Sequence, residues 1–168
     1  KGISGHQQLS DNTNTYLYIE PEQEPLQTGI LASGKLVDTQ TDAEGRNACA
    51  LWRFADGTRQ VNLRYGISFI SAEQAKKNLE REQEDYNVDA LAETGRDIWN
   101  KALSRIQGEG GTEDEKTVLY SSYYRTFERP ICMSEDGRYF SAFDGKIHED
   151  HGVPFYTDDW IWDTYRAA

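Results

Sequence analysis

Long apolar runs, basic residues and cysteines are all scarce in this sequence of 168 residues. It contains no run of about 20 apolar residues, so it predicts no transmembrane helix. The 18 Lys and Arg residues are outnumbered by 29 Asp and Glu residues, which gives a formal net charge of −11. A phosphate backbone would be repelled by that charge, so we expect no nucleic-acid partner. A neutral polyol or a cation remains a compatible ligand.

Cysteine and N-terminal signals are equally sparse. Cys49 and Cys132 are the only cysteines. Two distant cysteines form neither a disulfide framework nor a metal-spacing motif, so we expect unbridged thiols. The sequence starts at Lys1 without an initiator methionine or a signal peptide. We therefore expect a fragment of a longer protein, and the N-terminus does not indicate a compartment.

What the sequence does contain is a change of period near Ile70. Before it, residues 15–20 are rich in aromatic and β-branched side chains and are followed by Pro21, as in a strand that ends there. Gly29 is expected in a turn. Two further strands, at residues 49–54 and 60–70, flank a turn-forming segment and predict a hairpin. The second strand alternates, with one apolar face that should be buried (Val61, Leu63, Tyr65, Ile67 and Phe69). We expect the antiparallel closing strands of a β-sandwich.

After Ile70 the pattern is helical. Ser71 and Gln74 form a capping-box pattern at the start of a helix that runs to about residue 85. A second helix is expected at about residues 89–106, with an apolar stripe (Leu91, Gly95, Ile98, Trp99, Ala102, Leu103 and Ile106). Residues 108–111 read as a connector between helices, because they lack the lysine of a phosphate loop. Thr112 and Glu115 form a second capping box, and the helix they open should stop by Pro130.

The next segment, residues 131–157, combines loops and short strands. Asp136-Gly137 and Asp144-Gly145 are turn dipeptides, so these aspartates are expected to form turns rather than to act as acids. His148 and His151 look at first like a metal-binding pair. In an irregular loop their spacing imposes no common face, so we favour a solvated loop.

The densest chemical motif lies at residues 160–166, WIWDTYR. Flat indole faces stack on sugar rings, and a carboxylate with a guanidinium can hold hydroxyls. The same pattern also fits a helix whose Trp162 and Tyr165 belong to a core, with Asp163 as a favourable first-turn charge. The residues by themselves leave both interpretations open.

Five segments in order carry a family resemblance: residues 67–79 (ISFISAEQAKKNL), 99–106 (WNKALSRI), 116–125 (KTVLYSSYYR), 136–139 (DGRY) and 162–167 (WDTYRA). Together they resemble glycoside hydrolase family 92, the calcium-dependent, exo-acting α-mannosidases. The match runs from about Val61 to the end.

The resemblance implies an α+β chain, in which part of an antiparallel β-sandwich is followed by linker helices and the opening of an (α/α)6 barrel. Residues 1–70 would be the C-terminal part of the N-terminal sandwich domain, 71–110 the linker helices and 111–168 the start of the catalytic domain. Apolar faces such as the one bearing Leu91, Ile98 and Trp99 would need the remainder of the parent chain, or an oligomer partner, to cover them.

The resemblance also implies a function. The full-length enzyme would remove terminal α-linked mannose, with α-1,2 expected, from N-glycans or mannan by inverting hydrolysis assisted by Ca²⁺. The relatives' catalytic acid, base and calcium ligands correspond to sequence beyond Ala168, so this fragment alone should be inactive. The substrate-binding residues that do match are Trp162, Asp163 and Arg166, as a stacking wall, a hydroxyl acceptor and a charged orienter. A secreted, periplasmic or cell-surface location is implied by resemblance only. The alternative is a non-catalytic carbohydrate-binding or scaffold module.

Overall fold

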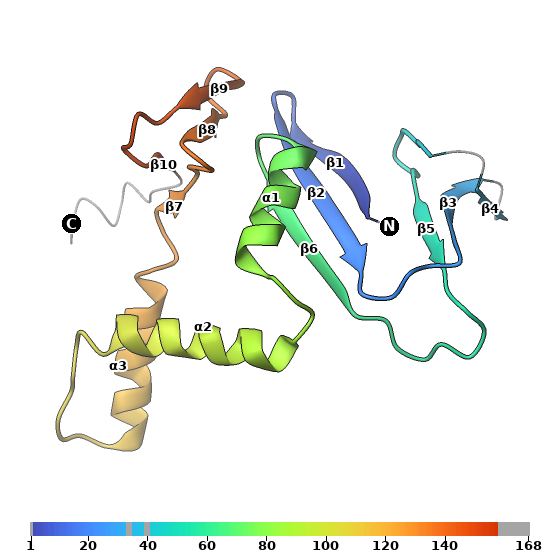
Figure 1. Ribbon diagram of the computed structural model, residues 1–168. Coiled ribbons are helices and arrows are strands. Elements are labelled where there is room, and N and C mark those ends of the chain that lie inside the picture. Colours follow the sequence, from blue (N-terminus) through green and yellow to red (C-terminus); the bar gives the residue numbers. More distant parts are fainter. Residues whose placement is uncertain (1, 33–34, 39–40, 158–168) are drawn as a thin grey trace. The chain divides into compact units, whose positions relative to one another are not determined.

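The computed structural model describes residues 2–32, 35–38 and 41–157. The chain forms two compact units, Lys1–Tyr86 and Asn87–Ala168. Among the described residues, strands and one helix belong to the first unit, and two helices followed by short strands belong to the second (Figure 1). The α+β class, with antiparallel strands before helices, is confirmed. The predicted domain boundaries after residues 70 and 110 remain a prediction.

The main sheet of the first unit is antiparallel, in the order β1 (Ile3–Ser10), β2 (Thr13–Pro21) and β6 (Leu63–Ser68). Pro21 ends β2 as expected, since proline cannot continue a ladder of hydrogen bonds. Helix α1 (Ala72–Glu82) follows β6 after a short turn and packs on this sheet. The helix starts where the sequence predicted, because the Ser71 side chain accepts a hydrogen bond from the Gln74 amide, at 3.0 Å.

The core of this unit lies between α1 and the sheet. Ala75 and Leu79 of the helix are 0% and 2% exposed. Gly66 of β6 allows the close approach, because a Cβ atom there would lie 2.2 Å from the Ala75 carbonyl oxygen. The buried polar side chains are also bonded: Gln74 donates to Asn78, and the Asn78 amide donates to the Ile67 carbonyl. Hydrogen-bonded burial of this kind specifies one position of the helix on the sheet.

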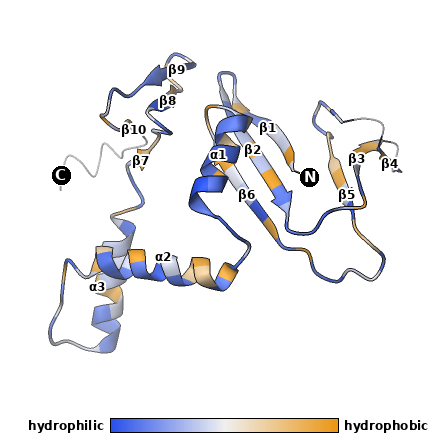
Figure 2. Cartoon of the chain, viewed as in Figure 1, coloured by the Kyte–Doolittle hydropathy of each residue, from blue (hydrophilic) through white to orange (hydrophobic). Residues whose placement is uncertain are grey.

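The prediction of which face of β6 is buried is wrong. The face bearing Gly66 and Ser68 is the buried one, whereas Leu63, Tyr65 and Ile67 are 47%, 62% and 52% exposed. The alternation is present, but α1 covers the face of small and polar residues. Only small residues let a helix backbone come this close, and the apolar residues therefore occupy the opposite face. Figure 2 shows apolar and polar residues along β6 as orange and blue bands.

A second antiparallel sheet has the order β4 (Lys35–Val37), β3 (Gln27–Ala32) and β5 (Ala50–Arg53). The turn between residues 55 and 58 forms, with the Thr58 amide donating to the Ala55 carbonyl. The predicted hairpin is nevertheless wrong, because β5 pairs with β3 while β6 pairs with β2. Gly29 lies inside β3 rather than in a turn. A Cβ atom there would lie 2.3 Å from the Val37 carbonyl oxygen.

Two helices open the second unit, α2 (Val88–Leu103) and α3 (Glu113–Arg125). The predicted capping box is confirmed at α3, where Thr112 and Glu115 each accept the other's backbone N–H. Aromatic rings join the two helices: Trp99 lies 4.4 Å from Tyr124 and 5.7 Å from Phe127, measured between ring centroids. Leu91, Ile98 and Trp99 remain at least 36% exposed, as the predicted uncovered stripe requires.

Short strands follow in two pairs: β7 (Ile131–Cys132) with β10 (Tyr156–Thr157), and β8 (Arg138–Ser141) with β9 (Lys146–Glu149). Asp136 and Gly137 have φ angles of 51° and 81°, and Glu135 and Arg138 exchange backbone hydrogen bonds across them. Two positive φ angles between paired residues define a type I′ turn, so the predicted turn role of Asp136 is confirmed.

Two further expectations can be compared with the described residues. Cys49 and Cys132 are free thiols. Within residues 2–32, 35–38 and 41–157, no helix has both the length and the apolar composition needed to cross a bilayer.

Candidate functional site

The predicted sugar-binding residues Trp162, Asp163 and Arg166 lie outside the described residues, so their roles stay a prediction. The structure does describe the segment that leads to them. The Met133 amide donates to the Phe155 carbonyl at 2.8 Å, and the Phe155 amide donates to Ser134 Oγ at 2.9 Å. These bonds extend the β7–β10 pairing from Tyr156 back to Phe155, so the described chain is paired from Phe155 to Thr157, just before the motif.

An aromatic stack ties the same segment to the β8–β9 hairpin. The Phe155 ring lies 4.1 Å from the Tyr139 ring with an interplanar angle of 13°. Tyr139 also stacks on His148, at 5.4 Å and 25°. Near-parallel rings at these separations contribute packing energy beyond their buried area. The hairpin and the segment before the motif therefore form one packed substructure of the second unit.

The histidine segment is not the irregular loop that the sequence suggested. His148 lies in β9, and its Nε2 atom is 3.1 and 3.0 Å from the two carboxylate oxygens of Asp144. This hydrogen bond lowers the pKa of Asp144, and the bond from the Lys146 amide acts in the same direction. Asp144 is thus an ionised turn residue, as expected, and not a candidate acid. His151 has a φ angle of 51° and lies in a tight turn.

Candidate metal ligands do not gather in the described residues. Among the residues that the structure describes, no group of three or more His, Cys, Asp and Glu side chains could hold a metal ion. His148 is directed to a carboxylate that also accepts a backbone amide, which is the arrangement of a braced turn.

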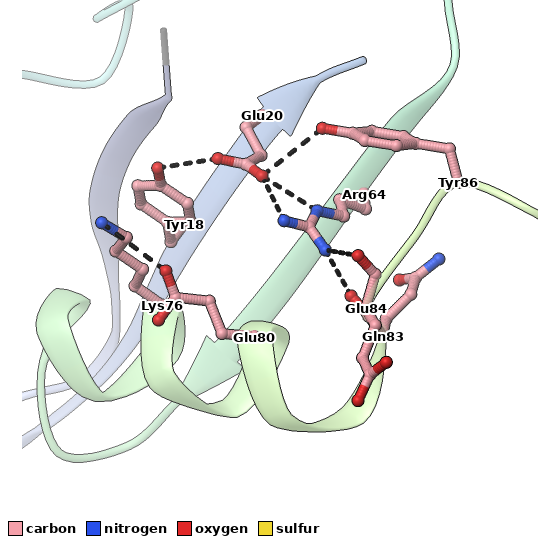
Figure 3. Close-up of polar contacts among 8 residues, drawn as sticks. All are labelled: Tyr18, Glu20, Arg64, Lys76, Glu80, Gln83, Glu84 and Tyr86. Atoms are coloured by element: carbon pink, nitrogen blue, oxygen red, sulfur yellow. Dashed lines mark hydrogen bonds and ion pairs between the residues drawn. The ribbon is translucent and has the colours of Figure 1, made fainter.

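A polar cluster of the first unit surrounds Arg64, and the sequence analysis did not identify it (Figure 3). We define the Arg64 cluster as Tyr18, Glu20, Arg64 and Tyr86. Arg64 donates from Nε and Nη2 to Glu20 Oε1, at 2.9 and 2.6 Å. The hydroxyls of Tyr18 and Tyr86 donate to the same carboxylate, at 3.0 and 3.4 Å. The guanidinium also lies 5.2 Å from the centre of the Tyr86 ring.

Burial and the charge of Glu20 shift the pKa values of this cluster. The Arg64 and Glu20 side chains are only 15% and 14% exposed. Burial alone would lower the pKa of Arg64, but the hydrogen bond and charge of Glu20 outweigh it and raise that pKa. Burial and the bond to Glu20 raise the pKa of Tyr18 to about 12.

Glu20 therefore does not have the properties of a catalytic acid. A general acid must carry a proton, and a partly buried carboxylate in contact with a guanidinium is held ionised. The signal that could have revealed the pair is strand register, since Glu20 and Arg64 are directly opposite on β2 and β6. Register was not available from the sequence, because the two residues are 44 positions apart.

Comparison with known proteins gives the family. A model of the glycosyl hydrolase family 92 catalytic domain matches residues 74–168, which is more than half of the chain. No curated protein matches the chain.

Solved structures match over nearly the whole chain. The family GH92 inverting mannosidase BT2199 from Bacteroides thetaiotaomicron VPI-5482 is 32% identical, with a TM-score of 0.78 over 98% of this chain and 24% of that protein. The family GH92 α-mannosidase BT3965 from Bacteroides thetaiotaomicron is 21% identical, with a TM-score of 0.74 over 97% of this chain and 25% of that protein. The family 92 hydrolase ccman5 is also 21% identical, with a TM-score of 0.75 over 95% of this chain and 24% of that protein.

The similarities to BT3965 and ccman5 show a shared fold. The chain spans about a quarter of the length of each of these proteins. The five ordered segments, the catalytic-domain match and the shared fold all agree, and the chain belongs to glycosyl hydrolase family 92.

Proposed function

We propose that the protein containing this chain is a glycoside hydrolase that removes terminal α-linked mannose from glycans. The observation that carries the proposal is the match of residues 74–168 to the family 92 catalytic domain. The alignment with an inverting mannosidase over 98% of the chain, at 32% identity, supports mannose as the sugar and inversion as the stereochemical course.

Within this chain the substrate would be bound by Trp162, Asp163 and Arg166. An indole presents a flat apolar face to the C–H bonds of a sugar ring. The Asp163 carboxylate accepts hydrogen bonds from sugar hydroxyls, and the Arg166 guanidinium donates to hydroxyl or ring oxygens. These three groups would hold and orient the terminal sugar, and they transfer no proton.

The proton transfers of an inverting hydrolase require two further carboxyl groups. They stand about 6.5–9.5 Å apart, one protonated to assist the leaving group and one ionised to activate water. In the first unit, Glu20 is paired with Arg64, and in the second, Asp144 is bonded to His148. Neither is available for such chemistry. The family resemblance assigns the acid and base to other sequence of the full-length enzyme.

Calcium belongs to the proposal through the family resemblance. The described residues bring together no group of three or more His, Cys, Asp and Glu side chains, and the resemblance assigns the calcium ligands to other sequence of the full-length enzyme. The expected result is that a chelator abolishes activity of the full-length enzyme and that added Ca²⁺ restores it. Activity that survives exhaustive chelation would remove calcium from the proposal.

The main experiment compares Asp163→Ala with the wild-type full-length enzyme on an aryl α-mannoside. We expect kcat/KM to fall at least tenfold, equivalent to about 1.4 kcal/mol of transition-state stabilisation. Asp97→Ala is the matched control, because Asp97 is an exposed carboxylate on α2. Unchanged kinetics for Asp163→Ala would show that this carboxylate only supports a helix start. The 168-residue fragment alone should release no mannose.

Product analysis tests the finer parts of the proposal. NMR of the first product formed should show β-mannose, since inversion converts an α-linkage into the β-anomer. Among α-1,2, α-1,3 and α-1,6 mannobiose, we expect the α-1,2 isomer to be cleaved fastest.

We also propose a secreted, periplasmic or cell-surface location, which fractionation of the producing cells would test. Glycan binding without hydrolysis would instead favour the non-catalytic module.

A further inference from the structure

Helix α1 belongs at once to the sheet unit and to the catalytic-domain sequence. The family match begins at residue 74, inside α1 (Ala72–Glu82). The same helix is packed on β2 and β6, with Gln74 and Leu79 each 2% exposed. The first residues of the catalytic-domain sequence are therefore built into the core of the sheet unit.

The Arg64 cluster lies where this helix ends (Figure 3). Arg64 Nη1 donates to the carbonyl oxygens of Gln83 and Glu84, the second at 2.8 Å. Gln83 is the extended C-cap of α1 and Glu84 follows it, so the guanidinium bonds the carbonyls of the two residues directly after the helix. Tyr86, two residues further, is held through its ring by Arg64 and through its hydroxyl by Glu20.

The Arg64 side chain thus restrains residues 83–86, the segment that follows α1. The residues that it restrains, 83–86, are followed at once by the cap Asn87 and the start of α2 at Val88. Arg64 itself lies on β6, ahead of the family match. Its planar fork reaches a carboxylate and two carbonyls together, which the single ammonium of a lysine cannot do.

We propose that Arg64, oriented by Glu20, is a positioning residue that fastens the start of the catalytic-domain sequence to the β-sheet and thereby supports substrate turnover by the full-length enzyme. Its catalytic part rests on the proposed function. Arg64 touches no substrate in this scheme. It acts by keeping residues 83–86 in one conformation on the sheet unit.

The test uses Arg64→Lys in the full-length enzyme, which keeps the positive charge and loses the fork. Hydrogen exchange of peptides covering residues 83–88 should become at least about tenfold faster, since charge-assisted hydrogen bonds are lost at a partly buried site. At a temperature where circular dichroism shows the variant fully folded, kcat/KM on a mannoside should fall about tenfold, because small displacements reduce catalysis steeply. Arg53→Lys is the matched control: Arg53 is an exposed strand arginine bonded to Gln27 at 3.4 Å, and both readouts should stay unchanged.

Every other outcome contradicts a stated part of the proposal. Unchanged exchange would show that Arg64 does not fix the segment, and faster exchange with unchanged kcat/KM would show a structural clip without a role in turnover. If Arg64→Lys does not fold, Tyr86→Leu, which removes the ring that Arg64 holds, takes its place with the same expected results. A wild-type enzyme without activity on any mannoside would overturn the proposed function, while the exchange comparison would still decide the fastening role.

Discussion

Replacing Gly66 by alanine is the sharpest single test of how α1 is seated on the sheet. The added Cβ atom would lie 2.2 Å from the Ala75 carbonyl oxygen, 2.9 Å from Leu79 Cβ and 3.0 Å from the Leu79 amide nitrogen. Two of these three atoms are backbone atoms of the helix. No side-chain rotation can relieve the contact, so the helix has to move away from β6.

The magnitude follows from two opposing terms. Overpacking a tight interior costs about 1–3 kcal/mol, and contact with backbone places this site at about 3 kcal/mol. Gly66 does not have a positive φ angle, so alanine fits its backbone and gains about 0.4–1 kcal/mol by restricting the unfolded chain. The net expectation is a loss of about 2 kcal/mol in the free energy of opening of α1.

Hydrogen exchange measures this loss locally, which avoids assuming a single transition for a chain of two units. A loss of about 2 kcal/mol corresponds to about thirtyfold weaker protection of the amides of α1. Gly5→Ala is the matched control, because Gly5 lies in β1 of the same sheet and a Cβ atom there would meet nothing within 4 Å. Its exchange should be unchanged or slightly slower.

Equal protection in Gly66→Ala and wild type would refute the argument, since it would mean that α1 is not in backbone contact with β6. A double variant sharpens the test. Truncating Leu79 in the Gly66→Ala background should restore nothing, because the closest atom belongs to the Ala75 backbone. Recovery of protection on that truncation would show that side-chain crowding was the cause.

Three other substitutions or conditions have expected outcomes. Gly95→Ala in α2 should raise the stability of the second unit by about 1 kcal/mol, measured by thermal unfolding, because a Cβ atom there meets nothing within 4 Å and alanine favours helix. Thr112→Ala should lower the helicity and stability of α3 by about 1 kcal/mol, since the hydroxyl that accepts the Glu115 amide is lost; Thr112→Ser should keep most of it. The free energy of unfolding should fall as the pH rises from about 10 to about 12, because an unfolded tyrosine ionises while Tyr18 keeps its proton until about 12. Tyr18→Phe should flatten that alkaline decline, and an equally steep decline in the variant would contradict the assignment.

Local signals in the sequence were reliable wherever a few neighbouring residues decide the structure. The cap at Ser71, the capping box at Thr112 and the turn at Asp136 are all formed as predicted. The two caps depend on side chains that bond backbone amides three positions away, and the turn depends on backbone bonds between residues three positions apart. Such local contacts can be predicted from the sequence because they do not involve any distant partner.

Predictions that depended on distant partners failed in specific ways. The segment between β5 and β6 contains a real turn, yet its flanking strands join different sheets. The alternation along β6 was read correctly, but the buried face was assigned to the wrong residues. A period of two reveals that a strand has two faces, and the element that packs against it decides which face is buried.

The sequence by itself determined the α+β class, the capped helices, the turns and, through five ordered segments, the family. Those features are local, or depend on residue order alone. Tertiary structure alone decided the strand partners, the seating of α1 over Gly66 and the Arg64 cluster, whose two charges are 44 residues apart in the chain. The physical reason is that an ion pair, a close backbone contact and a buried face are each properties of two segments brought together, and the register between those segments is set only when the sheet and the helix pack.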